Sequence, residues 1–207
     1  EASPVMTGND IITSSVTGLI YRINIKTGNV KWTTRPTDRK KTYGSFYTSP
    51  TILNNIIVAG NDDFNMYAFD TTAGKEQWKF KTNGSIFCDA SAFEEKIYFG
   101  SDDRNFYCLD TLGNLIWKKD LKTKFLSSST FYKDFVITSG IDGKIYAFDK
   151  NNGDIKWTYA TKGAISATPL LQEDKIFIGS YDKFFYCINA SDGRELWKYE
   201  CEGRIKT

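Results

Sequence analysis

The sequence predicts an all-β fold, a β-propeller of five four-stranded antiparallel blades, and three observations support this prediction. Five tryptophans recur at intervals of 46, 39, 40 and 40 residues. Each follows a tyrosine, an aspartate or asparagine, and a glycine at nearly constant spacing. Each period of about 40 residues also holds four short β-favouring runs divided by turn residues, which is the pattern of one propeller blade. The tryptophans are Trp32, Trp78, Trp117, Trp157 and Trp197.

The second repeat illustrates how each element is predicted. Its strands are expected at Ser49–Leu53, Ile56–Ala59, Asn65–Phe69 and Glu76–Lys79, because these runs are rich in β-favouring residues. The third and fourth strands are separated by a hairpin turn that contains a glycine, which adopts positive φ at little cost. An aspartate before that glycine can accept the backbone N–H groups of the turn. The other repeats keep this order, so the protein is expected to be almost wholly β.

The repeat runs from one end of the chain to the other, which predicts a single domain over residues 1–207. The repeats span approximately 1–44, 45–84, 85–124, 125–163 and 164–203, with residues 204–207 pairing towards the first strand. The last five residues resemble the beginning of a first strand, and the first four resemble its later half. A closed five-bladed ring is therefore favoured, because closure removes exposed strand edges.

Composition excludes several classes of function. The 207 residues are 41% hydrophobic and 25% charged, which is typical of a globular protein. A formal net charge of +2 gives no general reason to expect specific nucleic-acid binding. The longest uncharged run, Tyr43 to Asn61, contains Pro50 and two further asparagines, so no membrane span is predicted. A monomer is expected.

Residues that usually carry catalysis are few. The chain has no histidine, the commonest general base and metal ligand. Paired acids such as Asp62-Asp63 and Asp102-Asp103 could form a glycosidase or calcium site, but they recur at one position beside turn residues, which favours a structural role. Four cysteines lack the spacing of zinc or redox motifs, so buried thiols are favoured over a disulfide or a reactive thiol. These cysteines are Cys88, Cys108, Cys187 and Cys201.

Two repeats carry a recognisable motif. Tyr67-Ala68-Phe69-Asp70 is followed by Gly74 and Trp78, and the fourth repeat has the same residue types at the same spacing. This resembles the tryptophan-docking motif of quinoprotein-type, or PQQ-like, β-propellers, in which the tryptophan packs between adjacent blades. The resemblance covers all five repeats, although Asn24 and Asn189 replace the aspartate. Members of that family usually have seven or eight blades, so a fragment of such a propeller is the alternative to a closed ring of five.

The cofactor chemistry of that family does not carry over. Its quinone dehydrogenases are far longer, place an adjacent cysteine pair against the quinone, and hold calcium with acidic and amide ligands. No adjacent cysteines occur in this chain. The resemblance therefore implies the architecture alone, and we expect no catalytic residue, no metal and no cofactor.

Two connections depart from the repeat and are rich in cations. The first, residues 35–43, is about six residues longer than its counterparts, and the second covers residues 118–124. Both join the outermost strand of one blade to the innermost strand of the next, so both are expected on one face. A solvated loop is the simpler interpretation, but insertions that depart from their own repeat often confer binding specificity. The candidate partner-binding residues are Arg35, Arg39, Lys40, Lys41, Tyr43, Lys122 and Lys124.

We therefore expect a noncatalytic binding or scaffolding propeller that presents a partly basic face to a protein partner or an anionic ligand. The family resemblance implies a role in envelope protein assembly or lumenal sensing, and an extracytoplasmic location that is periplasmic, secreted or lumenal. The alternative is a cofactor- or carbohydrate-binding propeller, or an enzyme, that uses the central channel. Such an enzyme would be a quinone-dependent oxidoreductase or glycosidase-like.

Overall fold

The computed structural model describes residues 2–37 and 44–206, and every regular element within them is a strand. The strands form five four-stranded antiparallel sheets, each built from four consecutive strands. This confirms the predicted all-β propeller architecture. In blade order, the strands are β1 (Val5–Thr7), β2 (Asp10–Ser14), β3 (Ile20–Asn24) and β4 (Val30–Thr34); β5 (Thr51–Leu53), β6 (Ile56–Gly60), β7 (Asn65–Asp70) and β8 (Glu76–Lys81); β9 (Ser91–Phe93), β10 (Lys96–Gly100), β11 (Asn105–Asp110) and β12 (Leu115–Asp120); β13 (Thr130–Tyr132), β14 (Phe135–Ser139), β15 (Lys144–Asp149) and β16 (Ile155–Ala160); and β17 (Leu170–Gln172), β18 (Lys175–Gly179), β19 (Phe184–Asn189) and β20 (Glu195–Glu200).

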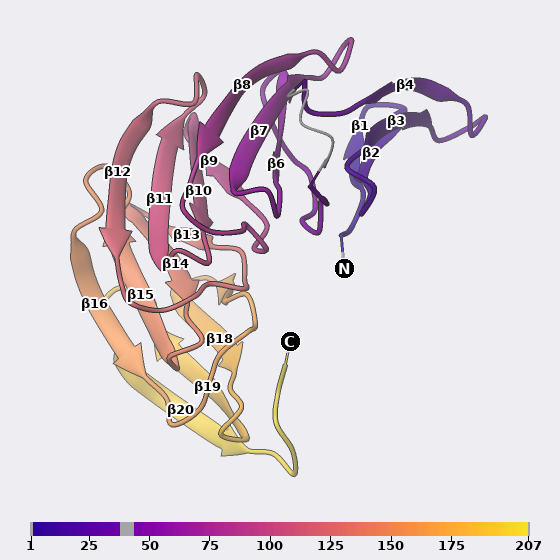
Figure 1. Cartoon of the computed structure of the whole chain (residues 1–207). Helices are drawn as coiled ribbons and strands as arrows, with labels where there is room; N and C mark the ends of the chain where they lie inside the picture. Colours follow the sequence, from indigo (N-terminus) through magenta and orange to yellow (C-terminus); the bar gives the residue numbers. More distant parts are fainter. Residues whose placement is uncertain (1, 38–43, 207) are drawn as a thin grey trace.

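The blades follow one another along a curved array (Figure 1). The first strands of neighbouring blades contact each other, as β1 does with β5 and β5 with β9. The first strand of each blade is therefore innermost and the fourth is outermost. In blade two, β6 and β7 begin at the predicted residues, whereas β5 begins two residues later and β8 ends two residues later than predicted. Strand ends depend on ladder hydrogen bonds between strands, which residue types do not encode.

The core consists of layers between blades. Successive strand residues point to opposite faces of a sheet, so an interior blade buries both faces. In β6, Ile57 belongs to the same buried cluster as Ile12 of blade one, whereas its neighbour Val58 clusters with Ile97 of blade three. All four side chains have no exposed surface. A continuous apolar run in the second strand of a blade thus serves two different interblade layers.

Each of the first four tryptophans docks on the next blade. Its indole N–H donates to the backbone carbonyl just after the turn aspartate or asparagine of that blade. The ring then lies against the turn glycine: at Gly113, where φ is +82°, a Cβ would stand 2.6 Å from Trp78. Glycine is needed there both for the positive φ and for the close approach of the ring. The donor–acceptor pairs are Trp32 to Thr71 (3.3 Å), Trp78 to Thr111 (2.9 Å), Trp117 to Lys150 (3.2 Å) and Trp157 to Ala190 (3.1 Å).

The fifth tryptophan has no such partner in the described part of the chain. Trp197 is 46% exposed, and its ring contacts are with Phe177 and Phe185 of its own blade. The corresponding turn glycine of blade one, Gly28, would have no atom within 4 Å of an added Cβ. In Figure 1, blades one and five stand apart at the two ends of the curve. The blades form an open arc, so the closed five-bladed ring favoured by the sequence is not confirmed.

The C-terminal segment lies against blade five. The backbone N–H of Ile205 donates to the carbonyl of Ser180 at 3.2 Å, and its side chain covers Gly179. Ile86 covers Gly60 in the same way where the chain enters blade three. Within residues 2–37 and 44–206, no ladder joins this segment to the first strand, so the pairing of residues 204–207 towards that strand stays a prediction.

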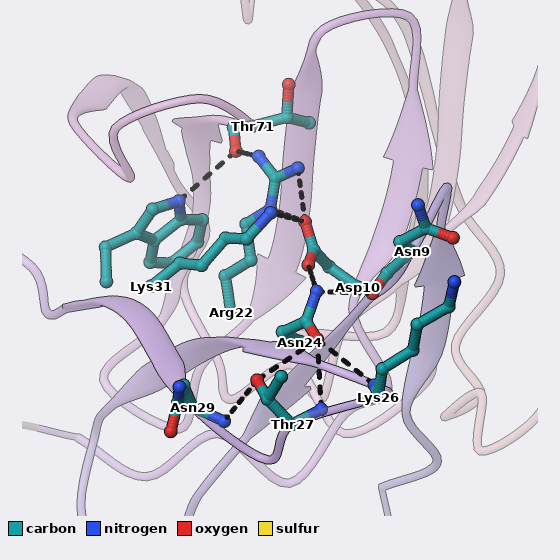
Figure 2. A network of polar contacts seen from close by, with 10 residues as sticks. Asn9, Asp10, Arg22, Asn24, Lys26, Thr27, Asn29, Lys31 and Thr71 are labelled. Atoms are coloured by element: carbon teal, nitrogen blue, oxygen red, sulfur yellow. Dashed lines mark hydrogen bonds and ion pairs between the residues drawn. The ribbon is translucent and has the colours of Figure 1, made fainter.

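A charged network reinforces the seam between blades one and two (Figure 2). Asp10 is 1% exposed, and its Oδ2 accepts Arg22 Nε and Lys31 Nζ, each at 2.8 Å. Arg22 Nη1 also donates to the carbonyl of Thr71 at 2.5 Å, and this carbonyl accepts the indole of Trp32 as well. The hydrogen bond from Lys31 is the main cause that lowers the pKa of Asp10, and it acts against burial, which would raise it. The network links blade one to the turn of blade two.

We expect Trp78→Ala and Trp157→Ala each to lower the free energy of unfolding by about 3–5 kcal/mol, because each removes a large aromatic side chain from a blade seam. Trp197→Ala is the matched control and should cost about 1–2 kcal/mol, since almost half of that side chain is already in water. Urea unfolding of the three variants measures the difference. Equal costs at all three positions would contradict the docking role.

Asp10→Asn should be less stable than the wild type at pH 7, because Arg22 and Lys31 would then face each other without a carboxylate. The pKa of Asp10 is lowered by folding, so its contribution is complete above the unfolded pKa of about 3.9 and is lost as the pH falls through the folded value. The stability difference between wild type and variant should therefore shrink below about pH 4. Asp154→Asn, at a carboxylate that is 63% exposed, is the control and should change little at any pH.

Candidate functional site

Cationic side chains gather at the junction of blades three and four, on the face formed by the blade-to-blade connections. Backbone hydrogen bonds fix this junction: Leu121 N–H donates to the carbonyl of Arg104, and Ile141 N–H to the carbonyl of Lys124, both at 3.1 Å. Between them lies a hollow of about 390 Å³, here named the basic hollow. It is lined by Arg104, Lys122, Thr123, Lys124, Ile141 and Asp142.

Most cations of the basic hollow are already paired. Lys124 Nζ lies 2.6 Å from Oδ2 of Asp102, and Lys122 bonds the carboxylate of Asp120. The hydrogen bonds from Lys122 lower the pKa of Asp120. Arg104 makes no ion pair with any residue that the structure describes. The positive charge of the hollow is therefore smaller than the number of its lysines suggests.

The structure brings together only part of the predicted site. Lys122 and Lys124 lie in the same connection and line the basic hollow. Arg35 is exposed at the end of blade one and makes an interaction of its own. Two residues later, Thr37 donates to Oε2 of Glu76 at 2.8 Å, on the outermost strand of blade two. The remaining predicted residues lie outside the described residues, so their grouping with the basic hollow stays a prediction; they are Arg39, Lys40, Lys41 and Tyr43.

An exposed apolar stripe runs beside the basic hollow, and the sequence predictions missed it. Tyr47, Phe87 and Leu126 are 45%, 39% and 45% exposed. They occupy one repeat position on blades two, three and four, each just after a buried residue of the entering connection. The rings of Tyr47 and Phe87 are 5.6 Å apart. Leu126 follows Lys124 by two residues, so the stripe adjoins the basic hollow.

The signal for this apolar stripe was present in the sequence as a departure from the repeat. In blade five the same position is Ser166, whose hydroxyl bonds the backbone of the terminal segment. Three large apolar residues at a position where serine suffices have no role in the core. Comparison of exposed repeat positions, as well as of connection lengths, would have identified them.

The repeated carboxylates have structural roles. Asp103 accepts the hydroxyl of Tyr107 at 2.6 Å and the backbone N–H groups of Asn83 and Asn105. Burial acts to raise the pKa of Asp103, but these hydrogen bonds outweigh it and hold the pKa below its usual value. A glycosidase general acid needs the opposite shift. The same Asp–Tyr pair occurs in blades two, four and five, which explains why these acids recur.

All four cysteines are free thiols, as the sequence favoured. Burial raises the pKa of Cys88 to about 12, and its Sγ accepts the backbone N–H of Gly100 at 3.0 Å. Within the described ranges, no three or more Cys, Asp or Glu side chains are close enough to hold a metal ion. None of the elements in residues 2–37 and 44–206 is a helix of the length and hydropathy needed to cross a membrane.

Comparison with known proteins places the chain in a family. The family model described as outer membrane protein assembly factor BamB matches residues 1–87 and 62–171. The chain therefore belongs to this family of PQQ-like repeat propellers, which confirms the resemblance seen in its tryptophan motif. None of the curated proteins searched matches the sequence.

Solved structures share the fold at low sequence identity. BamB from Moraxella catarrhalis is 16% identical with a TM-score of 0.79, and the alignment covers 93% of this chain and 58% of that protein. The computationally designed protein Ika8 is 16% identical with a TM-score of 0.82, over 99% of this chain and 63% of the other. Quinohemoprotein alcohol dehydrogenase from Comamonas testosteroni is 17% identical with a TM-score of 0.83, and the alignment covers 97% of this chain and 42% of that enzyme. The chain thus spans less than two thirds of each of these proteins.

Proposed function

We propose that this chain is a noncatalytic, protein-binding propeller that takes part in the assembly of outer-membrane proteins in an extracytoplasmic compartment and uses no cofactor. Its family supports the general role, since the matching model is described as an outer membrane protein assembly factor. The specific surface is argued from this chain's own residues, because a shared fold does not fix a function.

The apolar stripe is the observation that carries the proposal. Large exposed apolar side chains that gather in one place are typical of protein interaction sites, whereas scattered ones are not. Tyr47, Phe87 and Leu126 stand on three consecutive blades, and two of them are aromatic. Aromatic residues are enriched among the side chains that dominate binding energy at protein interfaces. The stripe lies on the innermost part of the blades, where a partner segment could contact several of them together.

The basic hollow adds charge selectivity to the apolar stripe. Arg104 presents a guanidinium without an ion pair among the described residues, and φ at this residue is +72°. Glycine occupies the equivalent turn position in blades one and four. The lysines are paired with Asp102 and Asp120, so they add little net charge, and Arg104 is the main cation offered to a partner. The partner we propose is therefore a protein segment with aromatic or aliphatic anchors and neighbouring acidic residues.

The alternative is a cofactor-dependent propeller of the dehydrogenase type. The likeness to a quinohemoprotein alcohol dehydrogenase concerns the fold, and this chain covers 42% of that enzyme. Ultraviolet-visible absorption and metal analysis of the purified protein separate the two functions. A stoichiometric quinone or calcium would overturn the noncatalytic proposal.

We expect Tyr47→Ser with Phe87→Ser to weaken partner binding by about tenfold or more, because two aromatic anchors are lost from the apolar stripe. The partner is first captured from an envelope extract of the source organism and identified by mass spectrometry, and its purified form is then titrated. Ile155→Ser, at an outermost-strand side chain that is 48% exposed, is the matched control. Unchanged affinity in the double variant would show that the stripe is not the docking surface.

Reversal of Lys122 and Lys124 to glutamate should slow association and flatten the dependence of affinity on salt. Both side chains are substantially exposed, at 76% and 44%, so stability should change by no more than about 1 kcal/mol. The matched control reverses Lys26 and Lys75, which are exposed in turns between third and fourth strands. An affinity that responds equally to both pairs of reversals would assign the effect to net charge instead of to the basic hollow.

A further inference from the structure

A second hollow, of about 320 Å³, opens between blades two and three at the other end of the strands. We name it the seam hollow. Its apolar wall consists of Leu53, Ile56 and Trp78, with Leu112 73% exposed at its edge. Asn54, Gln77 and Thr111 supply polar groups. It is built from the turn after the first strand of blade two and the turn after the third strand of blade three, so it is separate from the basic hollow.

The neighbouring seam shows what normally occupies this space. Lys150 stands in blade four where Thr111 stands in blade three, one residue after the turn aspartate. Its ammonium lies 2.8 Å from Glu94 and 3.2 Å from Asp134, and 5.4 Å from the ring centre of Phe93. The side chain is 10% exposed. The seam between blades three and four is thus filled by a long cationic side chain and closed by its ion pairs.

Between blades two and three, the lysine and one of its two acidic partners are missing. Thr111 is too short to reach across the seam, and Asn54 stands at the repeat position of Glu94. The space is left open, and no charged residue lines it. A charged ligand would lose its hydration there without gaining a counter-charge, which is costly. The seam hollow therefore favours an uncharged ligand.

The polar groups of the seam hollow have unused hydrogen-bonding capacity. The side-chain amides of Asn54 and Asn55 make no hydrogen bond to any residue within the described ranges. Gln77 uses only its amide N–H, which donates to the carbonyl of Lys75 at 3.3 Å. Amide groups both donate and accept, so they match a ligand with several hydroxyls. Trp78 and Leu53 offer the apolar surface on which the C–H face of such a ligand can rest.

We propose that the seam hollow is a binding site for an uncharged saccharide and accommodates one pyranose ring. Its volume is at the lower end of the range of about 300–1,000 Å³ that small-ligand sites occupy, which suits a single sugar unit. Polar and apolar side chains alternate along its lining, as in Leu53-Asn54-Asn55-Ile56 and Gln77-Trp78, so a ring with hydroxyl edges and C–H faces can meet both kinds of group. This site goes beyond the proposed protein-docking function and shares no residue with the apolar stripe or the basic hollow.

The test titrates the protein with methyl α-D-glucopyranoside and with N-acetyl-D-glucosamine, and follows the tryptophan indole N–H signals by NMR. Trp78→Phe identifies the signal of Trp78. Saturable shifts of that signal, with Kd of about millimolar magnitude, are expected for at least one sugar. n-Butylammonium serves as the cationic probe and should bind more weakly than that sugar. Binding of the cation alone, or no saturable sugar response at roughly fifty times that concentration, would overturn the proposal.

Two variants locate the response. Asn54→Glu with Thr111→Lys copies the filled seam of blades three and four, so it should stay folded and weaken sugar binding by about tenfold or more. Gln77→Leu keeps the side-chain size, removes one amide, and should also weaken sugar binding. It keeps the test decisive if the double variant does not fold. Ile116 stands on blade three at the repeat position that Gln77 holds on blade two. Ile116→Ala is therefore the matched control and should leave sugar binding unchanged. Sugar binding that survives both site variants would place the ligand elsewhere and overturn the proposal.

The double variant of the apolar stripe, Tyr47→Ser with Phe87→Ser, should keep full sugar binding. Failure of the saccharide proposal is therefore distinguishable from failure of the docking surface.

Discussion

The hydrogen bond from a tryptophan indole to a carbonyl of the next blade is the constraint on which this fold depends. It occurs at four successive seams, with N–O distances between 2.9 and 3.3 Å. Because the ring must lie against the turn of the neighbouring blade, that turn needs a glycine with positive φ, and an aspartate or asparagine next to the acceptor carbonyl. One contact thus accounts for the aspartate or asparagine, the glycine and the tryptophan that recur together in the sequence, while the recurring tyrosine pairs with another aspartate. The indole contact also fixes how one blade is placed on the next.

The residues that make this contact were predictable from the sequence. The side chains that fill the rest of the space between neighbouring blades were not. The turn aspartates, the glycines and the presence of four strands in each blade follow from local patterns that recur in every repeat. Lys150 and Glu94 are 56 positions apart and belong to different blades, so only the placed blades reveal their ion pair. Closure of the ring, which the sequence favoured, is not confirmed for a related reason. The two chain ends resemble complementary halves of a strand, but the curvature that would bring them together depends on every seam. In the arc that residues 2–37 and 44–206 form, Trp197 docks on no other blade.

The candidate site shows why counts of charge along a chain overestimate a basic surface. Lys122 and Lys124 made their connection appear cationic, yet the fold places Asp120 and Asp102 against them. Exposed pairs of this kind contribute at most about 1 kcal/mol to stability, and they also reduce the charge offered to a partner. Apolar side chains cannot be neutralised in this way. Tyr47, Phe87 and Leu126 stay 39% to 45% exposed with the neighbouring blades in place, so they define the docking surface more sharply than the lysines do.

The seam hollow and the apolar stripe are two places where side chains, and with them function, can change without loss of the fold. The tryptophan contact holds each pair of blades together, so the side chains beside it can change as long as the space is filled or compensated. Asp10 with Arg22 fills the first seam, and Lys150 with Glu94 fills the third. The second seam keeps the strong indole bond of 2.9 Å but leaves its neighbouring space open. Since this opening and the apolar stripe are at different ends of the strands, a ligand in one can bind while a protein occupies the other, and each can evolve under its own selection.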